Sequence, residues 1–118
     1  MILIIGGAYQ GKLDYARTVL GVTDIFTCIG GEIDFSKPCI CQLEEFTRVH
    51  PDPVGYFAEN REKWQGSVLI CRDIFCGVVP LEAEDRAWRQ RTGRLCQYLS
   101  REAEQVSRIF CGLEQRLK

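Results

Sequence analysis

The stretch that decides the fold is Ile2-Leu3-Ile4-Ile5-Gly6-Gly7-Ala8-Tyr9-Gln10-Gly11-Lys12, close to the start of the sequence. Residues 2–5 form an uninterrupted apolar run, which is typical of a strand buried on both faces of a parallel sheet. Residues 6–12 fit the pattern G-x-x-x-x-G-K, whose glycines let backbone amides turn inward around phosphate oxygens. From about Gly11 to Leu20 the apolar residues recur at helical spacing. The stretch therefore predicts a strand, a phosphate-binding loop and a helix in succession.

The rest of the chain alternates between strand and helix patterns. Short β-prone or apolar runs predict strands over residues 24–29, 39–46, 67–71 and 109–111. Helical spacing predicts helices over residues 54–63 and 82–107. Buried strands that alternate with helices favour an α/β fold, a mostly parallel open sheet with flanking helices. We expect one domain over residues 1–118.

Composition excludes several classes of protein. The 118 residues are 46% hydrophobic and 26% charged, which argues against intrinsic disorder. A net charge of −1 argues against a general nucleic-acid binder. No apolar run approaches the ~20 residues of a membrane span, and the opening run lacks the basic region and cleavage site of a signal peptide. These features predict a cytoplasmic protein.

Seven cysteines occur at positions 28, 39, 41, 71, 76, 96 and 111. An odd number of cysteines in a chain without a signal peptide argues against a disulfide framework. The sequence contains no C-x-x-C pair, the spacing that is typical of zinc sites. Most of them lie in apolar runs, so we expect them to be small buried residues.

The candidate phosphate site consists of consecutive residues. They are Gly6, Gly7, Ala8, Tyr9, Gln10, Gly11, Lys12 and Leu13. Lys12 is expected to reach the β- and γ-phosphates of a nucleotide, while the start of the next helix faces the same anion. Leu13 stands where Ser or Thr would hold Mg²⁺, so a metal site is weakened or lost. Asp73 is the best remaining carboxylate for a metal or for catalysis, or else a turn carboxylate beside Arg72.

Two regions resemble the bifunctional adenosylcobinamide kinase / adenosylcobinamide-phosphate guanylyltransferase family of cobalamin biosynthesis. Residues 2–12 are similar to the opening strand and GGARSGKS loop of that family. Residues 71–80, Cys-Arg-Asp-Ile-Phe-Cys-Gly-Val-Val-Pro, resemble its TNEVGxGIVP segment, and residues 86–99 resemble its RxFRDxxGRxNQxL helix. The ending at residues 111–118 is similar to GIPLRLK. The likeness covers about residues 1–20 and 67–118.

The resemblance implies a RecA-like P-loop nucleotide-binding fold with a shortened middle region. It implies GTP- or ATP-dependent phosphorylation of adenosylcobinamide, followed by transfer of GMP to that phosphate through a histidine. It also implies a homo-oligomer, with Arg89 and Arg94 as contacts for phosphate or for a neighbouring subunit.

The chain departs from the family pattern at catalytic positions. Leu13 replaces a serine, residues 71–73 replace Thr-Asn-Glu, and the only histidine, His50, lacks the arginine-flanked setting of the guanylylated histidine. The departures leave three alternatives. The chain is a nucleotide-dependent corrinoid kinase, a nucleotide- or anion-binding partner protein that lacks both activities, or an interaction domain whose long helix forms an oligomer face around Trp88. Trp88 could equally cover the sheet.

Overall fold

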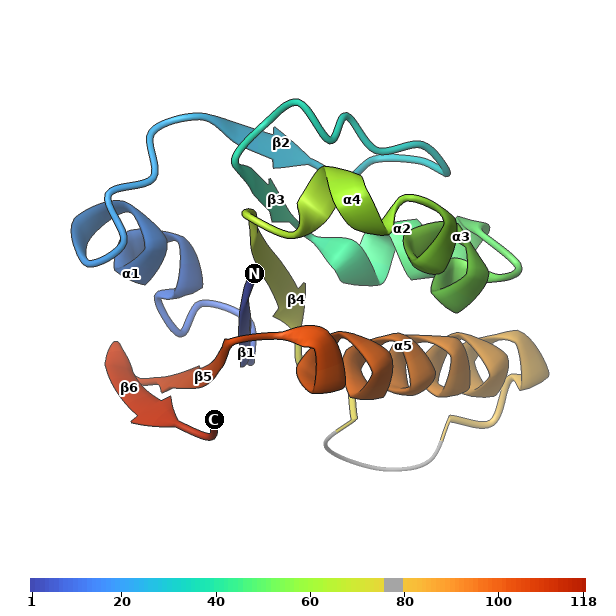
Figure 1. Cartoon of the computed structure of the whole chain (residues 1–118). Coiled ribbons are helices and arrows are strands. Elements are labelled where there is room, and N and C mark those ends of the chain that lie inside the picture. Colours follow the sequence, from blue (N-terminus) through green and yellow to red (C-terminus); the bar gives the residue numbers. More distant parts are fainter. Residues whose placement is uncertain (76–79) are drawn as a thin grey trace.

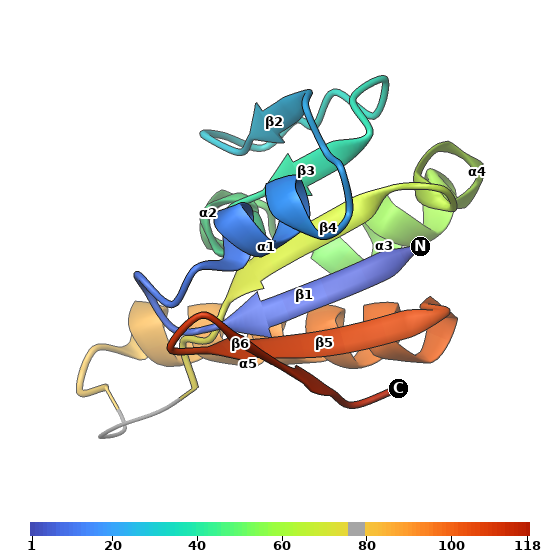
Figure 2. The same cartoon turned by 90° about the vertical axis from the view of Figure 1, so that its left-hand side faces the viewer.

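The structure, a computed structural model, describes residues 1–75 and 80–118. It contains a six-stranded sheet in the order β2-β3-β4-β1-β5-β6. The strands are β1 (Ile2–Gly6), β2 (Ile25–Thr27), β3 (Cys39–Cys41), β4 (Val68–Arg72), β5 (Gln105–Phe110) and β6 (Leu113–Arg116). Strands β1 to β5 all run parallel to one another, and β6 is antiparallel to β5. Figure 2 shows the order from β2 at the top to β6 at the bottom.

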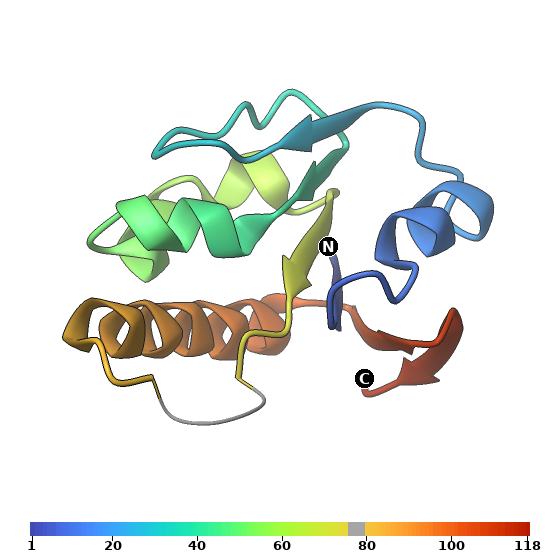
Figure 3. The same cartoon turned by 180° about the vertical axis from the view of Figure 1, so that it is seen from behind.

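Five helices flank this sheet. They are α1 (Lys12–Thr18), α2 (Leu43–Val49), α3 (Pro53–Glu59), α4 (Arg61–Trp64) and α5 (Ala83–Glu102). Helix α1 lies on one face of the sheet, and the other four lie on the opposite face (Figures 1 and 3). The predicted α/β fold with a mostly parallel sheet and flanking helices is therefore confirmed. No helix in the described part of the chain is long and apolar enough to cross a membrane.

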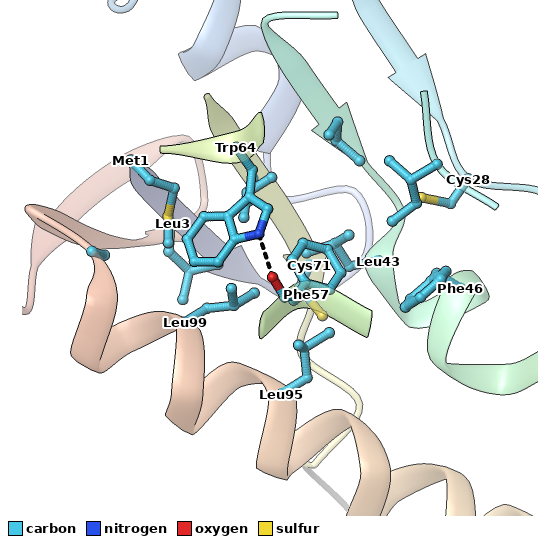
Figure 4. Packing of buried hydrophobic residues seen from close by; sticks show 14 of the residues in the cluster. Met1, Leu3, Cys28, Leu43, Phe46, Phe57, Trp64, Cys71, Leu95 and Leu99 are labelled. Carbon is cyan, nitrogen blue, oxygen red and sulfur yellow. Dashed lines mark hydrogen bonds between the residues drawn. The ribbon is translucent and has the colours of Figure 1, made fainter. Parts of the chain in front are cut away.

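The larger core lies between the sheet and helices α2 to α5 (Figure 4). Trp64, Phe57 and Phe46 are almost wholly buried there, together with Leu95 and Leu99 of α5. The indole N–H of Trp64 donates to the carbonyl oxygen of Phe57 at 2.8 Å. Burying this polar group with a partner avoids the cost of an unpaired donor, so the tryptophan can occupy the centre of the core.

The smaller core lies under α1. Tyr15 and Ala16 of this helix are buried against Ile4 of β1, Ile70 of β4 and Ile109 of β5. Because successive residues of a strand point to opposite faces, Ile4 belongs to this cluster while Leu3 belongs to the larger one. The continuous apolar run of β1 thus supplies both cores, as expected of a central parallel strand.

The predicted strand over residues 39–46 is wrong in its second half. Only its first three residues form β3, and helix α2 begins at Leu43. Gln42 adopts a left-handed backbone (φ 58°) that ends the strand. Leu43 and Phe46 are three residues apart and both fully buried, which is helical spacing on one face.

The predicted helix over residues 82–107 is wrong at its end. Helix α5 ends at Glu102, and the chain is extended from Ala103 onward. Val106 belongs to β5, where it lies opposite Leu3 of β1. Its three-residue spacing from Ala103 also fits a helix, so periodicity alone could not separate the two states.

Two further differences concern the predicted strand over residues 109–111 and helix over residues 54–63. Strand β5 starts at Gln105, four residues earlier than predicted, and Cys111 lies in the turn that leads to β6, a strand the sequence reasoning missed. The expected helix over residues 54–63 is split into α3 and α4 at Asn60.

The described cysteines are free thiols. Those at positions 28, 39, 41 and 71 are buried, as expected, and burial raises the pKa of Cys28 and of Cys39 to about 12. Cys96 is half-buried, and Cys111 is exposed, so the prediction of a buried residue is wrong there. Cys76 lies outside the described residues, so the prediction for this cysteine concerns a part that the structure does not describe. The same holds for residues 76–79 of the segment that resembles TNEVGxGIVP.

Candidate functional site

The glycine-rich loop leaves the carboxyl end of β1, a central strand, and leads into α1. Tyr9 and Gly11 have positive φ angles of 58° and 97°, which turn the backbone sharply between strand and helix. At the start of the loop, a Cβ at Gly6 would lie 2.5 Å from the carbonyl oxygen of Ile109 on the adjacent strand. Both glycines of the G-x-x-x-x-G-K pattern are therefore explained by the structure. Gly6 allows the close approach of β5, and Gly11 allows a left-handed backbone.

Two neighbouring segments hold the loop in place. From the carboxyl end of β4, the Asp73 N–H donates to the carbonyl oxygen of Gly6 at 2.7 Å. From the turn between β5 and β6, the Gly112 N–H donates to the carbonyl oxygen of Gln10 at 2.9 Å, and the Cys111 N–H donates to its side-chain oxygen at 2.6 Å. The loop is therefore anchored at both ends by backbone hydrogen bonds.

Lys12 folds back over the loop. Its ammonium group donates to the carbonyl oxygen of Gly7 at 2.6 Å. Burial lowers the pKa of Lys12 from its ordinary value, and the nearby carboxylate of Glu44 opposes part of that decrease. A cation that is partly desolvated gains strongly from an anion placed beside it.

The loop forms one wall of a pocket of about 620 Å³. Its other walls come from α1, from the ends of β3 and β4, and from the start of α2. The charged side chains that line it are three cations and two acids: Lys12, Arg17, Arg72, Asp14 and Glu44. The balance favours an anionic ligand, and the volume is in the range of small-molecule sites.

Glu44 is the main functional candidate that sequence reasoning missed. Its side chain is buried, with the residue 5% exposed, and its carboxylate oxygen accepts from the Arg72 N–H at 2.9 Å. Its backbone oxygen accepts from the indole N–H of Trp88 at 2.7 Å. Trp88 is thus buried against α2, so it does not form an exposed oligomer face.

A signal for Glu44 was present in the sequence. Ligands in open parallel sheets bind at the carboxyl ends of the strands, and Gln42 and Glu44 follow β3 directly. To recognise them, one must know where β3 ends, and the predicted strand over residues 39–46 places that end too late. In the sequence, Arg17 lies within the helix predicted from about Gly11 to Leu20, and Arg72 is named only as the neighbour of Asp73.

The other predicted site residues lie around the pocket or away from it. Asp73 follows β4, beside the loop, and its carboxylate accepts from the Phe75 N–H at 2.9 Å, a turn contact. Arg89 donates to the carbonyl oxygen of Phe75. Arg94 lines a separate cavity of about 310 Å³ with Arg91 and Arg101. The two predicted arginines therefore do not line the pocket of the loop.

Comparisons with known proteins do not identify this chain: no family model and no curated protein matches it.

The site offers little to a metal ion by itself. Among the described residues, no group of three or more His, Cys, Asp or Glu side chains could hold one. Leu13 packs against the smaller core and supplies no oxygen. Mg²⁺ in nucleotide sites needs only one or two carboxylates, because phosphates and waters complete its shell. Glu44 is the buried carboxylate that fits this role.

Proposed function

We propose that the chain binds the phosphates of a nucleoside triphosphate, GTP or ATP, in the pocket formed by residues 6–13. The observation that carries the proposal is the glycine-rich loop at the end of β1, with a half-buried lysine at its base. Loops of this kind bind phosphate through backbone amides, and a lysine neutralises the outer phosphates. The place of this loop, between the carboxyl end of the central strand β1 and helix α1, supports the proposal of a P-loop nucleotide-binding fold.

Lys12 provides the specific chemistry of this proposal. Its ammonium group donates to the Gly7 carbonyl oxygen, and phosphate oxygens would replace that partner. Because a bound phosphate favours the charged form, it raises the pKa that burial lowers. The net positive lining, with Arg17 and Arg72, attracts the same anion.

The first prediction concerns nucleotide binding. At about 100 times its dissociation constant, GTP or ATP should stabilise the protein by ~2.7 kcal/mol, seen as a rise of several degrees in Tm. Lys12→Met should abolish this rise. The variant itself should unfold at the same temperature or higher, because a lysine whose pKa is lowered in the folded state opposes folding at neutral pH.

The matched control is Lys63→Met, which removes an exposed lysine from α4. Thermal unfolding of wild type and both variants, with each nucleotide and with or without Mg²⁺, gives the answer. An equal rise in all three proteins, or none in wild type, contradicts nucleotide binding at this loop.

A second candidate function, phosphoryl transfer, is favoured by the buried carboxylate of Glu44 in the same pocket. In such a reaction the bond between the γ-phosphorus and the β–γ bridging oxygen breaks, and a bond to an acceptor hydroxyl oxygen forms. Glu44 would accept the hydroxyl proton or hold Mg²⁺ on the phosphates. The acceptor suggested by the family resemblance is adenosylcobinamide, through its aminopropanol hydroxyl. The alternative is a partner protein that binds nucleotide without chemistry.

The second prediction separates these alternatives. With adenosylcobinamide and γ-labelled nucleotide, wild type should transfer label, and Glu44→Gln should lower the rate by about 10² to 10⁴-fold. Glu45→Gln, one residue away and paired with Arg48, should keep the rate. Wild-type transfer no faster than that of Lys12→Met rejects the kinase. Nucleotide binding that ignores Mg²⁺ then favours the partner protein.

A further inference from the structure

Strand β6 forms an open edge of the sheet. It pairs with β5 on one side, and among the described residues no strand pairs with its other side. All its residues, Leu113–Arg116, are exposed. An edge strand presents backbone N–H and C=O groups that can template pairing with another strand.

The turn before β6 determines which backbone groups face the open edge. Cys111 and Gly112 form a two-residue turn with φ angles of 52° and 76°, so Phe110 and Leu113 are the closing hydrogen-bonded pair. Backbone groups in an antiparallel ladder alternate between its two sides. The N–H and C=O groups of Glu114 and Arg116 therefore point outward.

Side chains of this strand alternate between the two faces of the sheet. Glu114 and Arg116 lie on the face that carries α1, where the Glu114 carboxylate accepts from the Ser107 hydroxyl at 2.7 Å. Leu113 and the following Leu117 lie on the other face and are 73% and 53% exposed. The edge therefore has a charged side and an apolar side.

We propose that β6 pairs antiparallel with β6 of a second copy of this chain, about a twofold axis at Gln115. Glu114 then lies opposite the partner's Arg116, and Leu113 lies opposite the partner's Leu117. The outward backbone groups of Glu114 and Arg116 form the hydrogen-bonded pairs, and the two sheets become one continuous sheet.

Charge selects this register over its neighbours. Shifts that keep the outward groups paired move the strand by two residues. One such shift places Glu114 opposite the partner's Glu114, and the other places Arg116 opposite the partner's Arg116. Each shift therefore brings like charges together. Like charges directly opposite are unfavourable, whereas opposite charges and apolar pairs stabilise a sheet. In the same register, Leu113 and Leu117, which are exposed in the single chain, become buried against the leucines of the second copy. This burial favours a second copy of the chain as the partner.

The third prediction is a charge exchange. Wild type should show a concentration-dependent dimer by sedimentation between about 1 µM and about 1 mM. Glu114→Arg alone and Arg116→Glu alone should each weaken it at least tenfold, because each places like charges opposite each other. An equimolar mixture of the two variants should dimerise again, because every opposed pair is then of opposite sign. The restored dimer also demonstrates that both variants are folded.

A second measurement avoids changes of charge. In a Cys111→Ser background, Gln115→Cys should oxidise to a disulfide-linked dimer, because non-hydrogen-bonded opposed residues have Cα atoms about 4.5 Å apart. Gln97→Cys on the exposed side of α5 should not. Any one of three results overturns the proposal. The wild type is monomeric throughout the concentration range, the charge variants dimerise alone as tightly as wild type, or the two cysteine variants cross-link equally. The proposal is independent of nucleotide binding, so the two can fail separately.

Discussion

Gly6 shows how a single residue couples the loop to the sheet. Its Cα is so close to β5 that a methyl group there would lie 2.5 Å from a backbone oxygen of Ile109. Backbone cannot move aside as a flexible side chain can, so the strands would have to separate. Glycine is thus required at this position by packing, in addition to any role in ligand binding.

The fourth prediction follows from this contact. Gly6→Ala should lower the free energy of unfolding by about 1–3 kcal/mol, the usual cost of overpacking. Gly66→Ala is the control, since nothing lies within 4 Å of its added carbon, and it should be neutral or stabilising by about 0.4–1 kcal/mol. Urea unfolding of the two variants measures both. Equal stability of the two variants would mean that β1 and β5 separate easily.

At the scale of elements, α5 acts on the pocket through α2. The indole N–H of Trp88 donates to the backbone oxygen of Glu44, and the buried hydroxyls of Thr47 and Thr92 lie 2.6 Å apart. The Arg91 guanidinium also donates to the Thr47 carbonyl oxygen. These contacts fix the start of α2, from which the Glu44 carboxylate reaches the pocket.

The fifth prediction tests this coupling. Trp88→Phe removes the indole donor from the Glu44 carbonyl oxygen, which keeps the Thr47 hydroxyl as a second donor, and should cost about 0.5–1.5 kcal/mol. Trp64→Phe, which removes the indole bond to Phe57 in the core, should cost a similar amount. Only Trp88→Phe should also slow phosphoryl transfer or weaken nucleotide binding. Chemical unfolding and nucleotide titration of both variants measure the difference, and equal nucleotide affinities would argue that α5 does not position the site.

At the scale of the whole molecule, the parallel sheet creates the site. Residues 6–13, Glu44 and Arg72 are distant in sequence, and each follows or ends a different strand. Because β3, β4 and β1 are adjacent and parallel, their carboxyl ends meet at one edge of the sheet. The same topology leaves β6 at the outer edge of the sheet, while the turn that precedes β6 contacts the loop.

The α/β class, the first strand and the loop after it could be predicted from the sequence. A continuous apolar run and a glycine-rich turn are local signals, because each is visible in a few consecutive residues. The phosphate-binding role of the loop was a prediction from the same local pattern and remains one. Element ends were less predictable, as the overlong helix over 82–107 shows, because Val106 has helical spacing from Ala103 although it belongs to β5.

Only the tertiary structure decided which distant residues share the pocket. Glu44 shares the pocket with Lys12 because a left-handed Gln42 ends β3 and a hydrogen bond from Trp88, 44 residues away, holds the next helix. It also decided that Cys111 is exposed, in the turn after β5, and that β6 is the last strand of the sheet among the described residues. Local sequence specifies backbone shape over a few residues, whereas the contacts of a site depend on how those pieces pack.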